Sequence, residues 1–115
     1  MPYMTRQKVC ERLRLGLRQS YRLIGGAGRS HLLDAEKIIS ALNRAHRPAA
    51  RIDFVPSDMA TPEEAVETAG LEGVTPRMLT TWCRRTRNAP PHFRFNGHTI
   101  RFRTSELAAW AGGRA

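Results

Sequence analysis

The chain has 115 residues, and its 19 lysines and arginines against 10 aspartates and glutamates leave a formal net charge of +9. This length allows one ordinary domain or two very small ones. No apolar run is long enough to span a bilayer and no secretory signal core is visible, so we expect a cytoplasmic protein without a membrane partner. The two cysteines are far apart and exclude a disulfide framework.

The first half of the chain, residues 4–45, carries signals for three helices. Thr5 is placed to cap the first, a turn near Gly16 leads to the second, and Gly25 ends it. After a brief segment, AGRSHLL, Asp34 is placed to cap the third. The predicted helices cover residues 6–13, 17–24 and 35–45. The predicted order of the first half is therefore helix, turn, helix, short wing and helix.

A joint of residues 46–59, rich in proline and alanine, follows as a linker, and its IDFV core can add a short strand. The second half, residues 60–111, then repeats the order of the first. Thr61 opens a helix over EEAVETA, a turn at GLEGV follows, and Thr75 caps a helix that the segment NAPP ends. A hairpin comes next, and Thr104 or Ser105 caps the last helix.

The helix after Thr75 divides into two faces on a 3.6-residue period. Leu79, Trp82 and Cys83 share the side predicted to pack. The opposite side carries Arg77, Thr81, Arg84 and Asn88. We read both tryptophans, Trp82 and Trp110, as core residues.

The predicted hairpin is HFRFNGHTIRFR, in which Asn96-Gly97 between alternating runs is typical of a two-residue type I′ turn. In that register one face carries Phe93, Phe95, Ile100 and Phe102. The other face carries Arg94, Thr99, Arg101 and Arg103. An arginine-faced hairpin after an arginine-faced helix predicts a winged helix, and a plain hairpin with a solvated charged face is the alternative.

The expected fold is therefore mainly α with small β-hairpin wings, a tandem winged helix-turn-helix. Of the 19 basic residues 17 are arginine, and residues 77–103 hold seven arginines and no acid. Residues 6–29 hold seven basic residues and one glutamate. Arginine presents a planar fork of donors that suits phosphate and guanine. We therefore interpret the clustered positive charge as evidence for a polyanionic partner, and a general bias in composition is the alternative explanation.

These segments carry a resemblance to known DNA-binding families. GVTPRMLTTWCRR resembles the recognition-helix segment of MerR-type regulators, and HFRFNGHTIRFRTSELAAWA is similar to the wing and final helix of excisionase-type winged helix-turn-helix domains. LRLGLRQSYRLI after TRQKVCER resembles the excisionase pattern more loosely. The first half departs from the pattern at Gly16 and in its shortened wing, and the second half has a few extra residues in AGLEGV.

The resemblance implies that the second helix of each unit enters the major groove while the wing contacts backbone or minor groove. In the second half the implied contacts to base edges are Arg77, Thr81 and Arg84, with Thr80 and Asn88 beside them. The implied contacts to phosphates or minor groove are Arg85, Arg87, Arg94, His98, Arg101 and Arg103. In the first half the corresponding residues are Arg18, Gln19 and Arg22, with Arg14 and Arg29 as backbone contacts.

No arrangement of residues indicates catalysis or a cofactor. Cys83, His92 and His98 come nearest to a ligand cluster, but their spacing fits no zinc pattern. There is no glycine-rich phosphate loop, and no nucleophile has a visible base. We therefore expect a protein that is not an enzyme and holds neither cofactor nor metal.

Three functions remain open. The first is a recombination directionality factor that binds and bends DNA at repeated sites beside an integrase or recombinase. A compact transcriptional regulator acting with RNA polymerase is the second. The third is a protein-interaction module, an anti-activator that has lost DNA binding. Each DNA-binding alternative implies double-stranded DNA as partner, association with the nucleoid, and head-to-tail packing of the two units, between themselves or with another chain.

Overall fold

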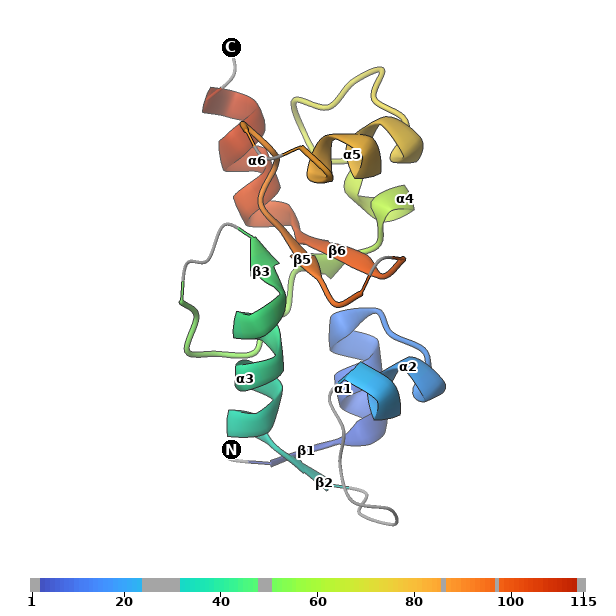
Figure 1. The fold of residues 1–115 in the computed structure, drawn as a ribbon, viewed down its shortest axis with the longest axis vertical. Coiled ribbons are helices and arrows are strands. Elements are labelled where there is room, and N and C mark those ends of the chain that lie inside the picture. Colours follow the sequence, from blue (N-terminus) through green and yellow to red (C-terminus); the bar gives the residue numbers. More distant parts are fainter. Residues whose placement is uncertain (1–2, 24–31, 48–50, 86, 97, 114–115) are drawn as a thin grey trace.

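The computed structural model describes residues 3–23, 32–47, 51–85, 87–96 and 98–113. They form an elongated body of 46 × 24 × 23 Å. In Figure 1 the elements before residue 46 lie at one end of this body, and the helices of the second half lie at the other. The predicted segment AGRSHLL and Arg29 fall largely or wholly outside the described residues.

The first half begins with a short strand that the sequence did not predict. Its elements are β1 (Tyr3–Thr5), α1 (Arg6–Leu13), α2 (Leu17–Leu23), β2 (Leu32–Asp34) and α3 (Ala35–Ala45), followed by β3 (His46–Arg47). Both predicted caps are confirmed: the Thr5 side chain accepts from the Lys8 amide at 3.1 Å, and Asp34 accepts from the Glu36 amide at 2.9 Å.

The second half has the same order with one further strand. Its elements are β4 (Met59–Ala60), α4 (Pro62–Ala65), α5 (Pro76–Cys83), β5 (His92–Arg94), β6 (Ile100–Arg103) and α6 (Thr104–Gly113). Thr61 and Glu64 form a reciprocal capping box on α4. The helix ends after a single turn, however, so the prediction of a helix through EEAVETA is wrong in its length.

The start of α6 is stabilised differently from the prediction. Rather than Thr104 or Ser105 capping the helix alone, Asp58 from the linker takes part. Its backbone oxygen accepts from the Thr104 amide at 3.0 Å, and its carboxylate accepts from the Ser105 amide at 3.1 Å. A residue distant in sequence thus satisfies amides that a helix start leaves unpaired.

Corresponding strands pair in the same way in the two halves. β1 pairs antiparallel with β2, and β4 pairs antiparallel with β6. The described residues therefore hold six helices and two small antiparallel sheets, one of two strands and one in the order β3-β5-β6-β4. The predicted strand at IDFV is absent there; the strands of the linker region lie at its two ends, in β3 and β4.

The hairpin is present, but its predicted register is wrong by one residue. Phe93 lies opposite Arg101 and Arg94 lies opposite Ile100. The loop is longer than a two-residue turn: the Phe95 amide bonds to the Thr99 oxygen at 3.0 Å, and the Asn96 side chain accepts two backbone amides of the loop. Residues directly opposite one another share a face, so the hairpin does not have one apolar and one arginine face.

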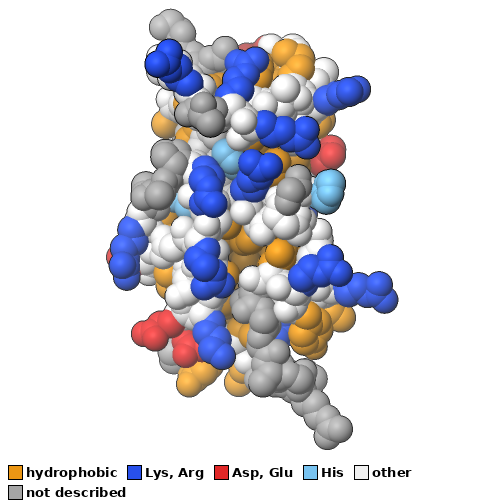
Figure 2. All heavy atoms as spheres, viewed as in Figure 1, with side chains coloured by type: hydrophobic (Ala, Val, Ile, Leu, Met, Phe, Trp, Pro, Cys, Tyr) orange, Lys and Arg blue, Asp and Glu red, His pale blue; other side chains and the backbone are white. Residues whose placement is uncertain are grey.

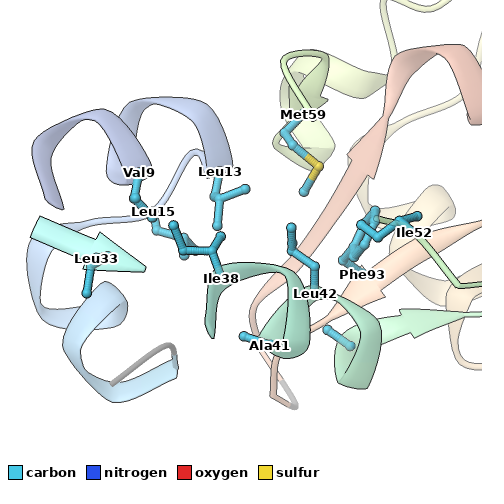
Figure 3. Packing of buried hydrophobic residues seen from close by; sticks show 11 residues of the cluster. Val9, Leu13, Leu15, Leu33, Ile38, Ala41, Leu42, Ile52, Met59 and Phe93 are labelled. Atoms are coloured by element: carbon cyan, nitrogen blue, oxygen red, sulfur yellow. The ribbon is translucent and has the colours of Figure 1, made fainter. Parts of the chain in front are cut away.

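The two strands of the hairpin instead serve two different cores. Phe93 on β5 is fully buried among residues of the first half, including Leu13 and Leu42. Figure 3 shows Phe93 beside Leu42, together with Ile52 and Met59 from the linker. The second core contains Ala60, Ala65, Leu71, Leu79, Cys83, Ile100, Phe102, Leu107 and Ala111. The hairpin and the linker therefore belong structurally to both halves.

Polar contacts also join the halves. The Arg101 Nε donates to the backbone oxygen of Arg14 at 2.8 Å, and the Arg14 Nε lies 3.3 Å from a carboxylate oxygen of Glu64. The Gln19 amide donates to the Thr99 hydroxyl at 3.3 Å. We call these three contacts the polar clasp. Together with the shared sheet, it places the hairpin loop against α2.

Within the described ranges, no helix is both long and apolar enough to cross a membrane.

Candidate nucleic-acid interface

Helix α5 presents the division of faces that its sequence predicts. Thr75 caps the helix by accepting from the Met78 amide at 3.1 Å, and Pro76 occupies the first turn, where its missing amide costs nothing. Leu79 and Cys83 are buried in the second core. The basic and hydroxyl residues of the opposite face, Arg77, Thr81 and Arg84, are exposed.

The end of α5 differs from the prediction. The helix stops at Cys83, and Arg84 is its C-cap. Asn88 therefore does not continue the helical face; it lies beyond it with a left-handed backbone at φ 57°. Asparagine tolerates this conformation better than most residues, and two prolines follow at positions 90 and 91. These features keep the chain from resuming a helix after α5, which already ends at Cys83.

Two hydroxyls on α5 have local partners. Thr80 and Thr81 both donate to the backbone oxygen of Arg77, at 3.1 and 2.8 Å. Their hydroxyl protons are therefore engaged within the helix, and what they can offer a ligand is an oxygen lone pair or a methyl group. Thr80 is half-buried and Thr81 is exposed.

The three arginines of the hairpin have different surroundings. Arg94 and also His98 are exposed. Arg101 is half-buried and is held in the polar clasp, and burial lowers the pKa of its guanidinium from the ordinary value. Its charge nevertheless persists, because arginine remains protonated in proteins. Arg103 pairs with Asp58 at 2.9 Å and stacks over the Phe54 ring, 4.9 Å from its centroid.

The predicted first-half residues are similarly divided. Arg18 and Arg22 are exposed on α2. Gln19 uses both ends of its amide within the protein, accepting from the Gly16 amide at 2.9 Å and donating to Thr99. Arg14 takes part in the polar clasp. Arg29 lies outside the described residues.

Several arginines meet around one cavity of about 490 Å³ at the end of α5. We call it the arginine cavity. Its polar lining comprises Arg47, Arg84, Arg85, Arg94, Asn88 and His92. Arg47, on β3, was missed by the sequence reasoning, because only the pairing of β3 with β5 brings the linker beside the hairpin. No acidic residue lines this cavity among the described residues.

His92 lies in the wall of the arginine cavity and is only 2% exposed. Its Nδ1 lies 2.8 Å from the Pro90 oxygen, so Nδ1 carries the proton and donates. Desolvation lowers the pKa of His92, and the hydrogen bond to Pro90 only partly opposes this, so the ring is neutral at pH 7. Its Nε2 is then an acceptor with no partner in the described part of the chain.

The structure does not bring Cys83, His92 and His98 together as a group of potential metal ligands. No group of three potential ligands lies together in the described ranges. Burial also raises the pKa of the Cys83 thiol to about 12, so it stays protonated and is a poor nucleophile.

A second cavity, of about 570 Å³, adjoins the first, because Arg85 and Asn88 line both. We call it the tryptophan cavity. Its other walls are Trp82, Trp110 and Gly113. The two indole rings are half-buried, with centroids 6.0 Å apart and planes inclined by 49°. They pack against the second core as expected, but they also reach the surface at this cavity.

Basic side chains extend beyond these cavities. Figure 2 shows lysines and arginines along most of the long axis of one face, with the few visible acidic side chains toward its edges. Such a face suits an extended polyanion better than a compact one.

No protein-family model matches this chain, no curated protein matches it, and no solved structure matches it.

Proposed function

We propose that the protein binds double-stranded DNA through α5 and the arginines around its C-terminal end. The observation that carries this proposal is the convergence of Arg84, Arg85, Arg94 and Arg47 on one cavity without an acidic lining residue. In this proposal the fold is a tandem winged helix-turn-helix of excisionase type, in which the second half reads sequence.

The roles proposed for individual residues follow from their exposure. Arg77, Thr81 and Arg84 lie on the open face of a capped helix, which suits base edges in a major groove. Arg85, Arg87 and Arg94 are exposed beside that face and suit phosphates. Arg101 and Arg103 are engaged within the protein, and we therefore propose that they position the hairpin.

Salt dependence tests the proposal most directly. If about six to eight arginines meet phosphates, log K on a bound duplex should fall with log salt at a slope of roughly −5 to −7, because each contact releases a condensed counterion. Titrations by gel shift or fluorescence anisotropy at several salt concentrations measure it. A slope near zero, or no binding to any duplex, would exclude DNA binding and favour the protein-interaction alternative.

Sequence reading is tested separately with single substitutions. Arg84→Ala should cost about 1–3 kcal/mol on a selected duplex and reduce the preference for guanine, since one arginine can grip two guanine acceptors. Arg18→Ala should have a smaller effect on preference. If Arg18→Ala abolished the preference and Arg84→Ala left it intact, the reading helix would be α2.

Two biological roles share this biochemistry. We propose a recombination directionality factor that bends repeated sites and contacts an integrase, and the compact transcriptional regulator is the second candidate. The small size of the tandem unit suits both roles. A footprint in the source genome distinguishes them, because a site beside an attachment site indicates recombination and a site over a promoter indicates regulation.

A further inference from the structure

Two adjoining cavities of complementary chemistry lie at the end of α5. The tryptophan cavity offers indole surface, and the arginine cavity offers guanidinium groups. They adjoin at Arg85 and Asn88, which line both. We propose that the pair forms a binding site for one nucleotide unit, with the base against the tryptophans and the phosphate among the arginines.

The tryptophan cavity has the features of a base platform. Trp82 and Trp110 already contact each other, so a base would stack on their exposed surface rather than enter between them. Every nucleobase has a π-face, and stacking on an aromatic side chain is the usual way in which an unpaired base is held. Arg85 in the same wall can add a cation–π contact to the base.

Asn88 stands at the junction of the two cavities. Its backbone is left-handed at φ 57°, an uncommon conformation that often marks a functional position. Within the described part of the chain no hydrogen bond engages its side-chain amide. This amide therefore has two donors and an acceptor with which to meet a base edge.

The arginine cavity supplies the charged donors that a phosphate needs. Arg84 and Arg94 contribute guanidinium forks from the two sides of the loop that follows α5, and Arg47 adds a third from the linker. His92 lies in the same wall, and its Nε2 is a buried acceptor that has no donor among the described residues.

The occupant can come from two sources, a free nucleotide or an unpaired nucleotide within a nucleic-acid strand. Either presents the same base, sugar and phosphate to the site. Neither source requires duplex binding by α5. The inference therefore goes beyond the proposed function and can fail independently of it.

Intrinsic fluorescence gives a direct test, because the chain has two tryptophans and both line the cavity. AMP is titrated into the full chain, with excitation at the red edge of the tryptophan band, where nucleobases do not absorb. We expect saturable quenching. Adenosine and ribose 5-phosphate, which each lack one part of the ligand, should bind at least about tenfold more weakly.

Substitutions assign the two halves of the site. Arg94→Gln should bring AMP to the affinity of adenosine and leave adenosine unchanged. Asn88→Gly keeps the left-handed backbone and should weaken AMP and adenosine but not ribose 5-phosphate. Lys37→Gln, at an exposed lysine on α3 to which no binding role is assigned, is the charge-matched control and should change none of the three.

A short single-stranded oligodeoxynucleotide distinguishes the sources. Quenching by AMP alone assigns the site to free nucleotides. Quenching by the oligonucleotide but not by AMP, removed by Arg94→Gln, assigns it to a strand. The proposal is overturned if neither probe quenches saturably, or if ribose 5-phosphate binds as tightly as AMP. A parallel gel shift on duplex DNA reports the proposed function separately, since its result does not depend on the mononucleotide titration.

Discussion

Asp58 connects three parts of the second half through one carboxylate. It accepts from the Arg103 Nε at 2.9 Å, from the Ser105 amide at 3.1 Å and from the Ser105 hydroxyl at 2.5 Å. Partial burial acts to raise the pKa of Asp58, but the hydrogen bonds from Ser105 and Arg103 outweigh it, and the pKa lies below its ordinary value. The ionised form is therefore stabilised by folding.

The first prediction concerns Asp58→Asn. It should lower the free energy of unfolding by about 1–3 kcal/mol at pH 7, because hydrogen bonds to a charged acceptor are lost. The stabilisation is present above the unfolded pKa of about 3.9 and is lost as the pH falls through the lower folded value. Urea denaturation from neutral to acidic pH measures both effects. Asp53→Asn, at an exposed carboxylate, is the control, and an equal loss in the two variants would contradict the assignment.

The second prediction is that substitutions of two hairpin arginines, Arg101 and Arg94, affect different properties of the protein. Arg101→Ala removes the bond to the Arg14 oxygen and should cost about 1–2 kcal/mol of folding free energy. Arg94→Ala, at an exposed position, should change stability by less than about 0.5 kcal/mol. If the protein binds DNA as proposed, the same variant should weaken binding to all duplexes. Chemical denaturation and gel shifts on the same two variants check this. A stability loss for Arg94→Ala as large as that for Arg101→Ala would contradict the observed register.

The sequence alone did not reveal that Arg101 contacts the first half of the chain whereas Arg94 is exposed. The sequence places Arg94 and Arg101 at similar positions of an alternating pattern, and a shift of one residue in register changes which side chain faces the other half. Arg47 was missed for the opposite reason, since its place beside β5 depends on a pairing over more than forty residues of chain. Long-range pairings of this kind leave no local signal in the sequence.

At the scale of elements, the sequence is most informative at helix starts. Thr5, Asp34 and Thr75 were predicted to cap a helix and Thr61 to open one, and each of the four is an N-cap. Capping is a local interaction over three residues, so local sequence specifies it. The strands β1, β3 and β4 have two or three residues each, which is too short for an alternating pattern to be recognisable.

The third prediction tests the cap of α5. Thr75→Ala should destabilise the protein by about 1 kcal/mol, whereas Thr75→Ser keeps the accepting hydroxyl and should have little effect. If α5 is the DNA-reading helix, the alanine variant should also lose more affinity for a selected duplex than for random DNA. Denaturation and competition gel shifts measure the two effects. Equal stability of the alanine and serine variants would show that the cap contributes nothing.

At the scale of the whole molecule, the two halves form one structural unit. Phe93 completes the core of the first half, and the polar clasp holds the hairpin loop against α2. Each half by itself is too small to bury a secure core. Packing of the halves against one another fits the expectation from the sequence, although the hairpin's role in joining them was not foreseen.

The fourth prediction follows from this sharing. Unfolding should be a single transition in which tryptophan fluorescence, which reports the second half, coincides with far-UV circular dichroism, which reports both halves. Phe93→Ala should cost about 3–5 kcal/mol, because it leaves a cavity in a fully buried site. Exposed Phe54 offers a control: Phe54→Ala should cost much less. Separate transitions for the two probes would show that the halves fold independently.

The position of Phe93 also matters while the chain is being made. Domains commonly begin to fold from their N-terminal end as they leave the ribosome. Here the helices of the first half emerge first, yet the Phe93 ring that completes their core is added only after the linker and α5. Until then the Phe93 ring does not cover the apolar surface of these helices. Nascent chains of this protein should therefore gain resistance to protease in one step, after β5 has emerged, rather than half by half.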